Sequence, residues 1–161
     1  MKKTKAMHKL ERHGISYGWI EYSYDPANLD VRKIAEDNRI EVSHIFKTLA
    51  IEGDKTGLLV AVVPGHLKLN RKALAKASGN KKISLVSLDK LEKQTGYIRG
   101  GCCPIGMKSN PPIYIDSYAK ELGFVFVNAG RRGVLLKLRL EDLLKVVEGE
   151  VMDLGEEYPK A

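Results

Sequence analysis

Residues 45–63 read IFKTLAIEGDKTGLLVAVV, two apolar runs separated by a polar turn. The first run, Ile45 to Glu52, and the second, Leu58 to Val63, have the length and the residue types of strands. The segment Gly53-Asp54-Lys55-Thr56-Gly57 between them has turn chemistry. The stretch therefore predicts a β-hairpin.

Further elements are predicted on both sides of this hairpin. Helix patterns, several of them opening on a capping residue or ending at a glycine, cover residues 4–13, 30–38, 70–79, 87–96 and 140–147. Aromatic and β-branched runs predict strands at residues 15–24, 83–86, 113–115, 124–127 and 134–138. The helix at 140–147 is expected to close the chain. Because strands and helices do not alternate regularly, the pattern predicts an α+β fold with a mixed, twisted sheet and short helices around it.

The chain of 161 residues has the length of a single domain, taken here as residues 1–161. Apolar residues make up 43% and no long polar tract interrupts them, so an ordered globular protein is expected. No apolar run is long enough to cross a bilayer, which argues against a membrane protein. The basic first residues are not followed by the hydrophobic stretch of a secretory signal, so we expect the protein in the cytoplasm.

Charge and cysteine content narrow the classes of partner and site. The net charge of +7 favours contact with phosphates, although the basic residues are spread along the chain as on many ordinary basic surfaces. Cys102 and Cys103 are adjacent, so no disulfide framework is available, which fits a reducing compartment. The cysteines and the four scattered histidines show no zinc spacing. No metal and no cofactor is predicted.

Lys47 interrupts the apolar face of the first hairpin strand. Side chains alternate along a strand, so Lys47 shares its face with three apolar side chains, those of Ile45, Leu49 and Ile51. A desolvated ammonium is costly unless something negative pairs with it, which is typical of a binding pocket. The alternative is that the strand begins after Lys47 and that the side chain reaches solvent.

A second feature is the loop Gly100-Gly101-Cys102-Cys103-Pro104-Ile105-Gly106. Glycines allow positive φ and the close approach of a ligand, and successive N–H groups in such a loop can bind an anion or oxyanion. The loop is neither a P-loop nor a dinucleotide fingerprint. One alternative is a tight structural turn. Another is a catalytic cysteine activated by a histidine, for which the sequence shows no local signature.

Two further segments could meet a ligand. The turn Asn128-Ala129-Gly130-Arg131-Arg132-Gly133 lies between two predicted strands. Its small residues and arginines could contact a ligand and its phosphates, or form an ordinary β-turn. Asp116 follows the apolar run Ile113-Tyr114-Ile115 directly. Its carboxylate could hold a ligand amine, pair with a cation, or cap the segment after it.

Taken together and in this order, these elements resemble the YbaK/EbsC family of aminoacyl-tRNA deacylases, which is similar to the editing domain of bacterial prolyl-tRNA synthetases. The resemblance runs from the first predicted helix to the last. It rests on a set of short motifs: Tyr22 before Asp25-Pro26, Phe46-Lys47-Thr48-Leu49, Thr95-Gly96-Tyr97, the loop at 100–106, Asp116 and Gly130-Arg131-Arg132-Gly133. It implies an α+β domain whose mixed, twisted sheet is partly barrel-like.

The resemblance implies an enzyme, a trans-editing deacylase that releases cysteine mischarged on proline tRNA. Cysteine is nearly the size of proline, and so small a difference gives binding little discrimination. In cysteine-specific members the substrate's own thiol attacks the ester, because an intramolecular thiol has a high effective molarity. The protein then needs no nucleophile, metal or cofactor of its own.

The resemblance also implies roles for individual residues. Lys47 would be the catalytic cation beside the ester and the terminal adenosine. Ten residues would bind the substrate or line its pocket: Tyr22, Thr48, Gly100, Gly101, Cys103, Pro104, Gly106, Asp116, Asn128 and Gly130. Two positions depart from the family, since Cys103 stands where relatives often have serine before the loop proline, and Asn128 stands where cysteine-specific relatives often have serine. The side chain of Asn128 leaves the identity of the removed amino acid open.

Three other functions stay open at this point. They are release of another small amino acid such as alanine, a non-catalytic tRNA-binding module, and a cysteine hydrolase. The partners that the resemblance implies are mischarged tRNA and prolyl-tRNA synthetase, which would supply tRNA specificity. The sequence does not indicate an oligomeric state.

Overall fold

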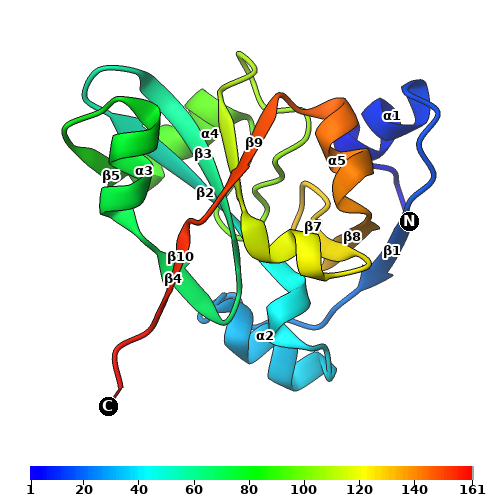
Figure 1. Cartoon of the computed structure of the whole chain (residues 1–161). Coiled ribbons are helices and arrows are strands. Elements are labelled where there is room, and N and C mark those ends of the chain that lie inside the picture. Colours follow the sequence, from blue (N-terminus) through cyan, green and yellow to red (C-terminus); the bar gives the residue numbers. More distant parts are fainter. Residues whose placement is uncertain (161) are drawn as a thin grey trace.

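The predicted hairpin is the centre of a mixed sheet in the computed structural model, which describes residues 1–160 (Figure 1). Its strands β2 (Ile45–Gly53) and β3 (Gly57–Pro64) pair antiparallel along nearly their whole length. β3 is buried continuously from Leu59 onward. Both faces of the sheet are covered at this point, which explains why the strand is a continuous apolar run without polar alternation.

The sheet contains eight strands in the order β1-β8-β7-β2-β3-β6-β9, with β5 paired to β2 beside this path. Three pairs are parallel, β2 with β7, β3 with β6 and β6 with β9, and the others are antiparallel. A separate pair joins β10 to β4. The remaining strands are β1 (Gly18–Glu21), β4 (Leu67–Leu69), β5 (Ile83–Leu85), β6 (Ile113–Asp116), β7 (Val125–Asn128), β8 (Val134–Leu138), β9 (Gly149–Met152) and β10 (Gly155–Glu157). The path runs from β1 to β9 without closing, and the predicted α+β class with a mixed sheet is confirmed.

Short helices surround the sheet, as predicted. They are α1 (Lys5–Arg12), α2 (Val31–Asn38), α3 (Arg71–Ser78), α4 (Leu88–Thr95) and α5 (Leu140–Val146), with 3-10 turns η1 (Val42–His44) and η2 (Ser117–Glu121). Thr4, Asp30 and Asn70 each accept a hydrogen bond from a backbone N–H of the helix that follows, so the predicted caps are confirmed. Ser87 stands at the start of α4, but its side chain makes no capping bond.

The end of the chain differs from the prediction. The helix at 140–147 was expected to be the last element, yet β9 and β10 follow α5. Their sequence lacks the apolar alternation of a strand, and partners far away in the chain impose the extended conformation. β9 pairs with β6 and β10 with β4, while Leu154 between them is fully buried.

Four clusters of buried side chains pack against the sheet. The main core joins the sheet to α1 and α5, with Met7, Leu10 and Leu143 fully buried. A second cluster packs Ile45 and Phe126 against α2. Figure 1 shows α2 below the sheet, with α1 and α5 on one side of the molecule and α3 with β5 on the other. Among the described helices, none combines the length and the apolar character needed to cross a membrane.

Candidate functional site

Lys47 lies inside β2, at the point where two parallel strands part. β2 begins at Ile45, so the alternative that the strand starts after Lys47 is wrong. β2 and β7 pair through residues 45–46 and 126–127, and Lys47 and Asn128 are the next residue on each strand. Ile45 and Phe126 belong to the same core cluster, so by alternation Lys47 and Asn128 leave the sheet on that same face. In mixed α/β sheets, ligands bind in such crevices at the carboxyl ends of parallel strands.

The half-buried Lys47 ammonium has an aromatic partner. Its Nζ donates a hydrogen bond to Tyr158 Oη at 2.8 Å and lies 5.2 Å from the centre of that ring. The guanidinium of Arg32 lies 4.5 Å from the same ring centre and hydrogen-bonds Asp30 at 2.9 Å. Hydrogen bonding by Arg32, and more weakly the charge of Lys47, holds the pKa of the Asp30 carboxyl below its usual value. The C-terminal segment, α2 and β2 therefore meet around one ring.

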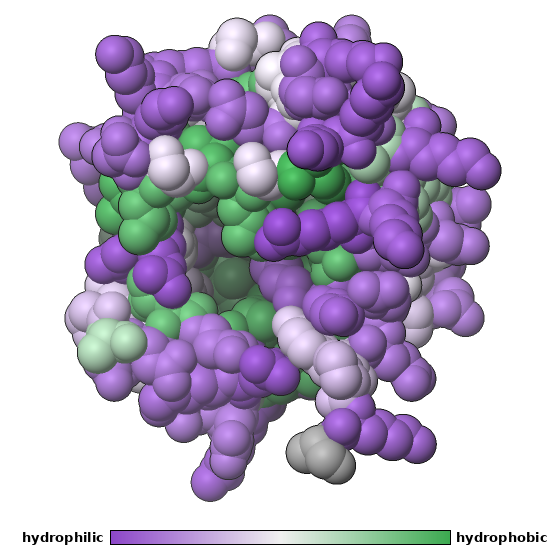
Figure 2. Space-filling view, turned by 90° about the vertical axis from the view of Figure 1, so that its left-hand side faces the viewer, coloured by the Kyte–Doolittle hydropathy of each residue, from purple (hydrophilic) through white to green (hydrophobic). Residues whose placement is uncertain are grey.

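A cleft of about 660 Å³ opens beside Lys47. Four of the residues that line it are cationic and one is acidic, so an anion is favoured there. The lining residues are Lys47, Leu49, Lys68, Leu69, Asn70, Arg71, Lys72, Leu85 and Glu156. Figure 2 shows the face that carries α3, which is hollowed, with hydrophobic groups in the hollow and mostly hydrophilic groups around it. The combination suits a ligand with an apolar part and a phosphate.

Asn128 links three of the predicted substrate-binding residues. Its Nδ2 donates to Tyr22 Oη at 3.2 Å and to the carbonyl oxygen of Gly100 at 2.9 Å, and its Oδ1 accepts from the N–H of Gly130 at 2.7 Å. Tyr22 is 8% exposed, and burial raises the pKa of its phenol. Four predicted residues from distant parts of the chain thus form one hydrogen-bonded group.

The glycine loop approaches this group closely at Gly100. Its φ of +80° favours glycine, and an added Cβ would lie 2.9 Å from a methyl carbon of Leu29. The N–H of Gly101 donates to the carbonyl of Ile98 at 2.9 Å. Because the Gly101 N–H is engaged in this bond, it is not free to bind an oxyanion. In this conformation, the cradle predicted for Gly100 and Gly101 therefore lacks one of its two N–H donors.

The two cysteines face the interior. Cys103 is fully buried in the main core, and burial raises the pKa of its thiol to about 12. Cys102 is half-buried, and burial raises the pKa of its thiol to about 11. The expected pocket-lining role of Cys103 is not what the structure shows, because a side chain without exposed surface cannot line an open cleft. The same burial removes the support for a nucleophilic Cys103.

Thr48 points to the face of β2 opposite Lys47. Phe46 and Ala50, which share that face by alternation, pack in clusters that include Cys103 and Cys102 of the glycine loop. The Thr48 hydroxyl is buried and has no hydrogen-bond partner among residues 1–160. An unpaired buried hydroxyl is costly, but this one has no exposed surface and lies on the face opposite Lys47, so it does not line the cleft beside Lys47. Among the described residues, no group of three or more His, Cys, Asp or Glu side chains is placed to hold a metal ion.

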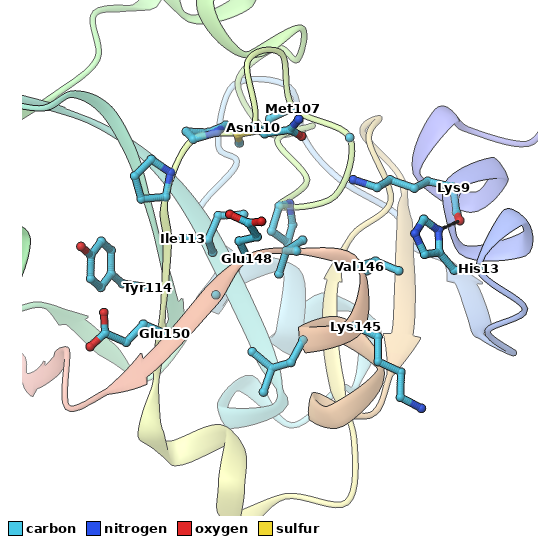
Figure 3. A pocket seen from close by; sticks show the side chains of 17 residues that line it. Lys9, His13, Met107, Asn110, Ile113, Tyr114, Lys145, Val146, Glu148 and Glu150 are labelled. Carbon is cyan, nitrogen blue, oxygen red and sulfur yellow. Dashed lines mark hydrogen bonds between the residues drawn. The ribbon is translucent and has the colours of Figure 1, made fainter.

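Three further predicted residues, Pro104, Gly106 and Asp116, also lie outside the hydrogen-bonded group of Asn128. Pro104 and Gly106 line another cleft of about 890 Å³, between the glycine loop, α1, α5 and β9 (Figure 3). Lys9 of α1 and His13, directly after that helix, face this cleft, while the acidic Glu148 reaches into it from below the loop. Asp116 is 4% exposed, and its carboxylate accepts hydrogen bonds from three backbone N–H groups, those of Tyr118, Leu154 and Gly155. These bonds explain the burial of the Asp116 carboxylate, because it holds the backbone around it. They leave it no free face for a substrate amine.

Sequence reasoning missed Tyr158 and Arg32. Tyr158 is an aromatic residue in a polar, charged terminal segment, which is only a weak signal. Arg32 was visible only as one of many exposed basic residues on a helix. Neither position could be connected to Lys47 before the strands were paired.

Residues 25–146 match the family model of the aminoacyl-tRNA editing domain. Over 152 residues the chain is 43% identical to EbsC of Enterococcus faecalis, named as a candidate Cys-tRNA(Pro)/Cys-tRNA(Cys) deacylase, and the match covers 94% of this chain and 93% of that protein. It is 28% identical over 120 residues to the uncharacterized protein YwhH of Bacillus subtilis, covering 74% of this chain and 76% of YwhH.

Solved structures share the fold. One, described as a candidate trans-editing enzyme for prolyl-tRNA synthetase, superposes with a TM-score of 0.81 at 22% identity, covering 96% of this chain and 99% of that one. Another, the hypothetical protein APE2540, has a TM-score of 0.84 at 22% identity, covering 95% of this chain and 100% of that one. At this identity the likeness concerns the fold alone.

Proposed function

The chain belongs to the aminoacyl-tRNA editing domain family, and we therefore propose that it is a trans-editing deacylase that releases cysteine mischarged on tRNA(Pro). The resemblance to the YbaK/EbsC family is confirmed by the family match and by the 43% identity to EbsC. The substrate is a mischarged tRNA, and the catalytic group of the protein is Lys47.

The observation that carries this proposal is the position of Lys47. Lys47 lies on β2 directly after the last residue paired with β7, and it lines a cleft with four cations and one carboxylate. The terminal nucleotide of a tRNA brings phosphates, and cationic side chains favour their approach. At the ester itself, a positioned ammonium stabilises the negative charge that develops on the carbonyl oxygen.

The group around Asn128 supports a small acyl pocket next to Lys47. Tyr22 and Gly100 are joined by the amide of Asn128, and Leu29 lies against Gly100. These contacts hold the pocket wall rigid, which allows one small side chain to be distinguished from a larger one.

The chemistry can proceed without a nucleophile from the protein. The sulfur of the substrate cysteine attacks its own ester carbonyl, the bond from that carbon to the ribose oxygen breaks, and the thiol proton passes to the ribose oxygen. Intramolecular attack has a high effective molarity. The burial of Cys103, with a pKa of about 12, agrees with a reaction that does not use an enzyme thiolate.

A second candidate substrate is tRNA charged with another small amino acid such as alanine. The observation that favours it is the amide of Asn128, which spans from Tyr22 to Gly100 and takes up room that a smaller side chain would leave open. Alanine has no thiol, so a water molecule would have to attack the ester. The same lack of an internal nucleophile makes this reaction the slower one for the site.

Prolyl-tRNA synthetase is the proposed protein partner. The cleft beside Lys47 offers charge for a phosphate backbone but little that could distinguish one tRNA from another. A synthetase that binds tRNA(Pro) would add this selectivity by holding the charged end near the site. Addition of prolyl-tRNA synthetase should then increase the rate of release from Cys-tRNA(Pro) more than that from Cys-tRNA(Cys).

The direct test is the release of amino acid from Cys-tRNA(Pro), Ala-tRNA(Pro) and Pro-tRNA(Pro). Wild type should release cysteine fastest and leave proline in place, and Lys47→Ala should abolish release. Lys120→Ala, which removes an exposed lysine of η2, is the matched control and should keep wild-type activity. Faster release of alanine would support the second candidate. Binding of the charged tRNAs without release from any of them would contradict the deacylase function and leave a tRNA-binding module.

A further inference from the structure

Tyr158 contacts the proposed catalytic lysine from outside the part of the chain that matches the family model. The match ends at residue 146, whereas Tyr158 lies twelve positions later. Its hydroxyl is 2.8 Å from Lys47 Nζ, across 111 positions of sequence. A contact between residues so far apart in the sequence, made with the central cation of the site, needs a structural cause.

The cause begins at Asp116. Oδ1 of this buried carboxylate accepts hydrogen bonds from the N–H groups of Leu154 and Gly155, both at 2.7 Å. Leu154 is fully buried in the cluster that contains Ile51 and Leu74. An added Cβ at Gly155 would lie 2.6 Å from Leu67, so no other residue fits there without movement. The chain is therefore anchored at Leu154 and at Gly155, where β10 begins.

β10 connects these anchored residues to the site around Lys47. Its residues pair antiparallel with β4, and Lys68 of β4 forms an ion pair with Glu156 at 3.5 Å. Lys68 and Glu156 also line the cleft beside Lys47. Tyr158 is the first residue after β10, so the strand pairing delivers its ring to the edge of that cleft.

We propose that Tyr158 is a positioning residue for Lys47, held in place by Asp116 through β10. The proposal rests on the deacylase function. A lysine side chain has a flexible four-carbon stem and three rotatable N–H donors. The Tyr158 hydroxyl accepts one of these donors and sets the direction of the other two, which point toward the substrate ester. The ring also lies against Arg32, which keeps it from turning away.

This arrangement gives Asp116 a task that does not require contact with substrate. Its carboxylate holds the backbone of Leu154 and Gly155, and this backbone sets the place of Tyr158. Asp116 and Tyr158 therefore act on the same group, Lys47, from opposite ends of β10. Substitution of either Asp116 or Tyr158 should therefore leave the Lys47 side chain less restrained.

The first experiment compares Tyr158→Phe and Tyr158→Ala with wild type. Tyr158→Phe keeps the ring and removes one hydrogen bond to a charged group, which predicts a fall of about ten-fold in kcat for Cys-tRNA(Pro). KM should change little, because the phosphates bind elsewhere in the cleft. Tyr158→Ala should lower kcat further. Tyr17→Phe, at a half-buried tyrosine of the main core, is the matched control and should leave both constants unchanged.

A second readout does not depend on activity. The rate at which acetic anhydride acetylates Lys47 is followed by mass spectrometry of the digested protein. It should rise in Tyr158→Phe, because the hydroxyl no longer restrains the amine. It should rise more in Tyr158→Ala, because the ring that shields the amine is lost as well. The exposed Lys120 is an internal standard in the same digest and should react equally in all variants.

The outcomes distinguish the positioning role of Tyr158 from the deacylase function. Unchanged acetylation of Lys47 in both variants overturns the positioning role, as does faster acetylation with unchanged kcat. A higher kcat or a lower KM in Tyr158→Ala also overturns it, because Tyr158 would then obstruct the substrate. If wild type releases no amino acid while the variants still expose Lys47 to acetylation, the deacylase function fails and the contact between Tyr158 and Lys47 stands.

Discussion

Asn128 Nδ2 and Tyr22 Oη lie 3.2 Å apart although 106 positions separate the two residues in the chain. The same amide nitrogen donates to the carbonyl of Gly100. One side chain on β7 thus joins the segment after β1 to the glycine loop. Asn128, one of the predicted substrate-binding residues, is therefore also a structural link of the candidate site.

Asn128→Ala should reduce stability and alter selectivity together. It removes hydrogen bonds to Tyr22 and Gly100 in a part-buried setting, which predicts a loss of about 1–3 kcal/mol in the free energy of unfolding. The larger pocket should decrease the release of alanine relative to cysteine. Urea denaturation and the panel of charged tRNAs measure the two effects. Tyr22→Phe removes only one of the bonds and should cost less, and an equal loss in both variants would contradict the central place of Asn128.

Asp116→Ala should release the C-terminal segment. It leaves three backbone N–H groups without their carboxylate, two of them bonded at 2.7 Å, which predicts a loss of about 3 kcal/mol in the free energy of unfolding. Hydrogen exchange of the Leu154 and Gly155 amides should become fast. Asp153→Ala is the matched control, because Asp153 is an exposed neighbour whose hydrogen bond is to Ser117. Protected amides at 154 and 155 in Asp116→Ala would refute this account.

Cys103 should resist alkylation in the native protein. It has no exposed surface and its pKa is raised to about 12, so almost no thiolate is available at pH 8. Iodoacetamide should label Cys102 slowly and Cys103 only after denaturation. Cys103→Ser should retain release of cysteine per folded molecule. Loss of activity in folded Cys103→Ser would instead favour a cysteine hydrolase.

Stability should decline at alkaline pH through Cys103. Burial raises the thiol pKa in the folded protein to about 12, while an unfolded cysteine titrates at about 8.5. The folded state therefore holds the proton more tightly. The resulting stability is fully present below about pH 8.5 and is lost as the pH rises toward 12. Urea midpoints between pH 8 and pH 11 should fall more steeply for wild type than for Cys103→Ala, and parallel curves would argue against the buried thiol as a cause.

The cationic residues other than Lys47 that line the cleft should affect the binding of charged tRNA and not the chemical step. Lys72→Ala should raise KM for every charged tRNA and weaken its dependence on salt, since each phosphate contact adds to that dependence. kcat should stay unchanged because the proposed contact of Lys72 is to phosphate, while Lys47 remains the cation at the ester. Steady-state kinetics over a salt series measure both effects, with Lys120→Ala as the control. A change in kcat at constant KM would contradict a role in phosphate binding.

The sequence was sufficient to predict the elements that depend on contacts between residues close together in the chain. Thr4, Asp30 and Asn70 cap helices because each side chain reaches an N–H only two or three residues away. The apolar runs of 45–63 form the hairpin because the turn between them is short. The motifs around Lys47 and the glycine loop were sufficient for the family, which the match to the editing domain confirms.

Other features depended on the order of strands in space. β9 and β10 were missed because their polar sequence extends only in contact with β6 and β4. Cys103 was expected at the pocket, but the path of the loop turns its sulfur into the main core. Asp116 was expected near the substrate, and its carboxylate is engaged by backbone N–H groups almost forty residues later.

The amino-acid sequence by itself determined the α+β class, the central hairpin, the helix caps and the family, because these follow from contacts within a few residues or from motifs that keep their order. Tertiary structure alone decided that Tyr158 meets Lys47, that Asn128 joins Tyr22 to Gly100, and that Cys103 is shielded from solvent. Each of these contacts depends on which strands pair and in which register. Pairing of that kind minimises the free energy of the whole chain, and no short segment encodes it.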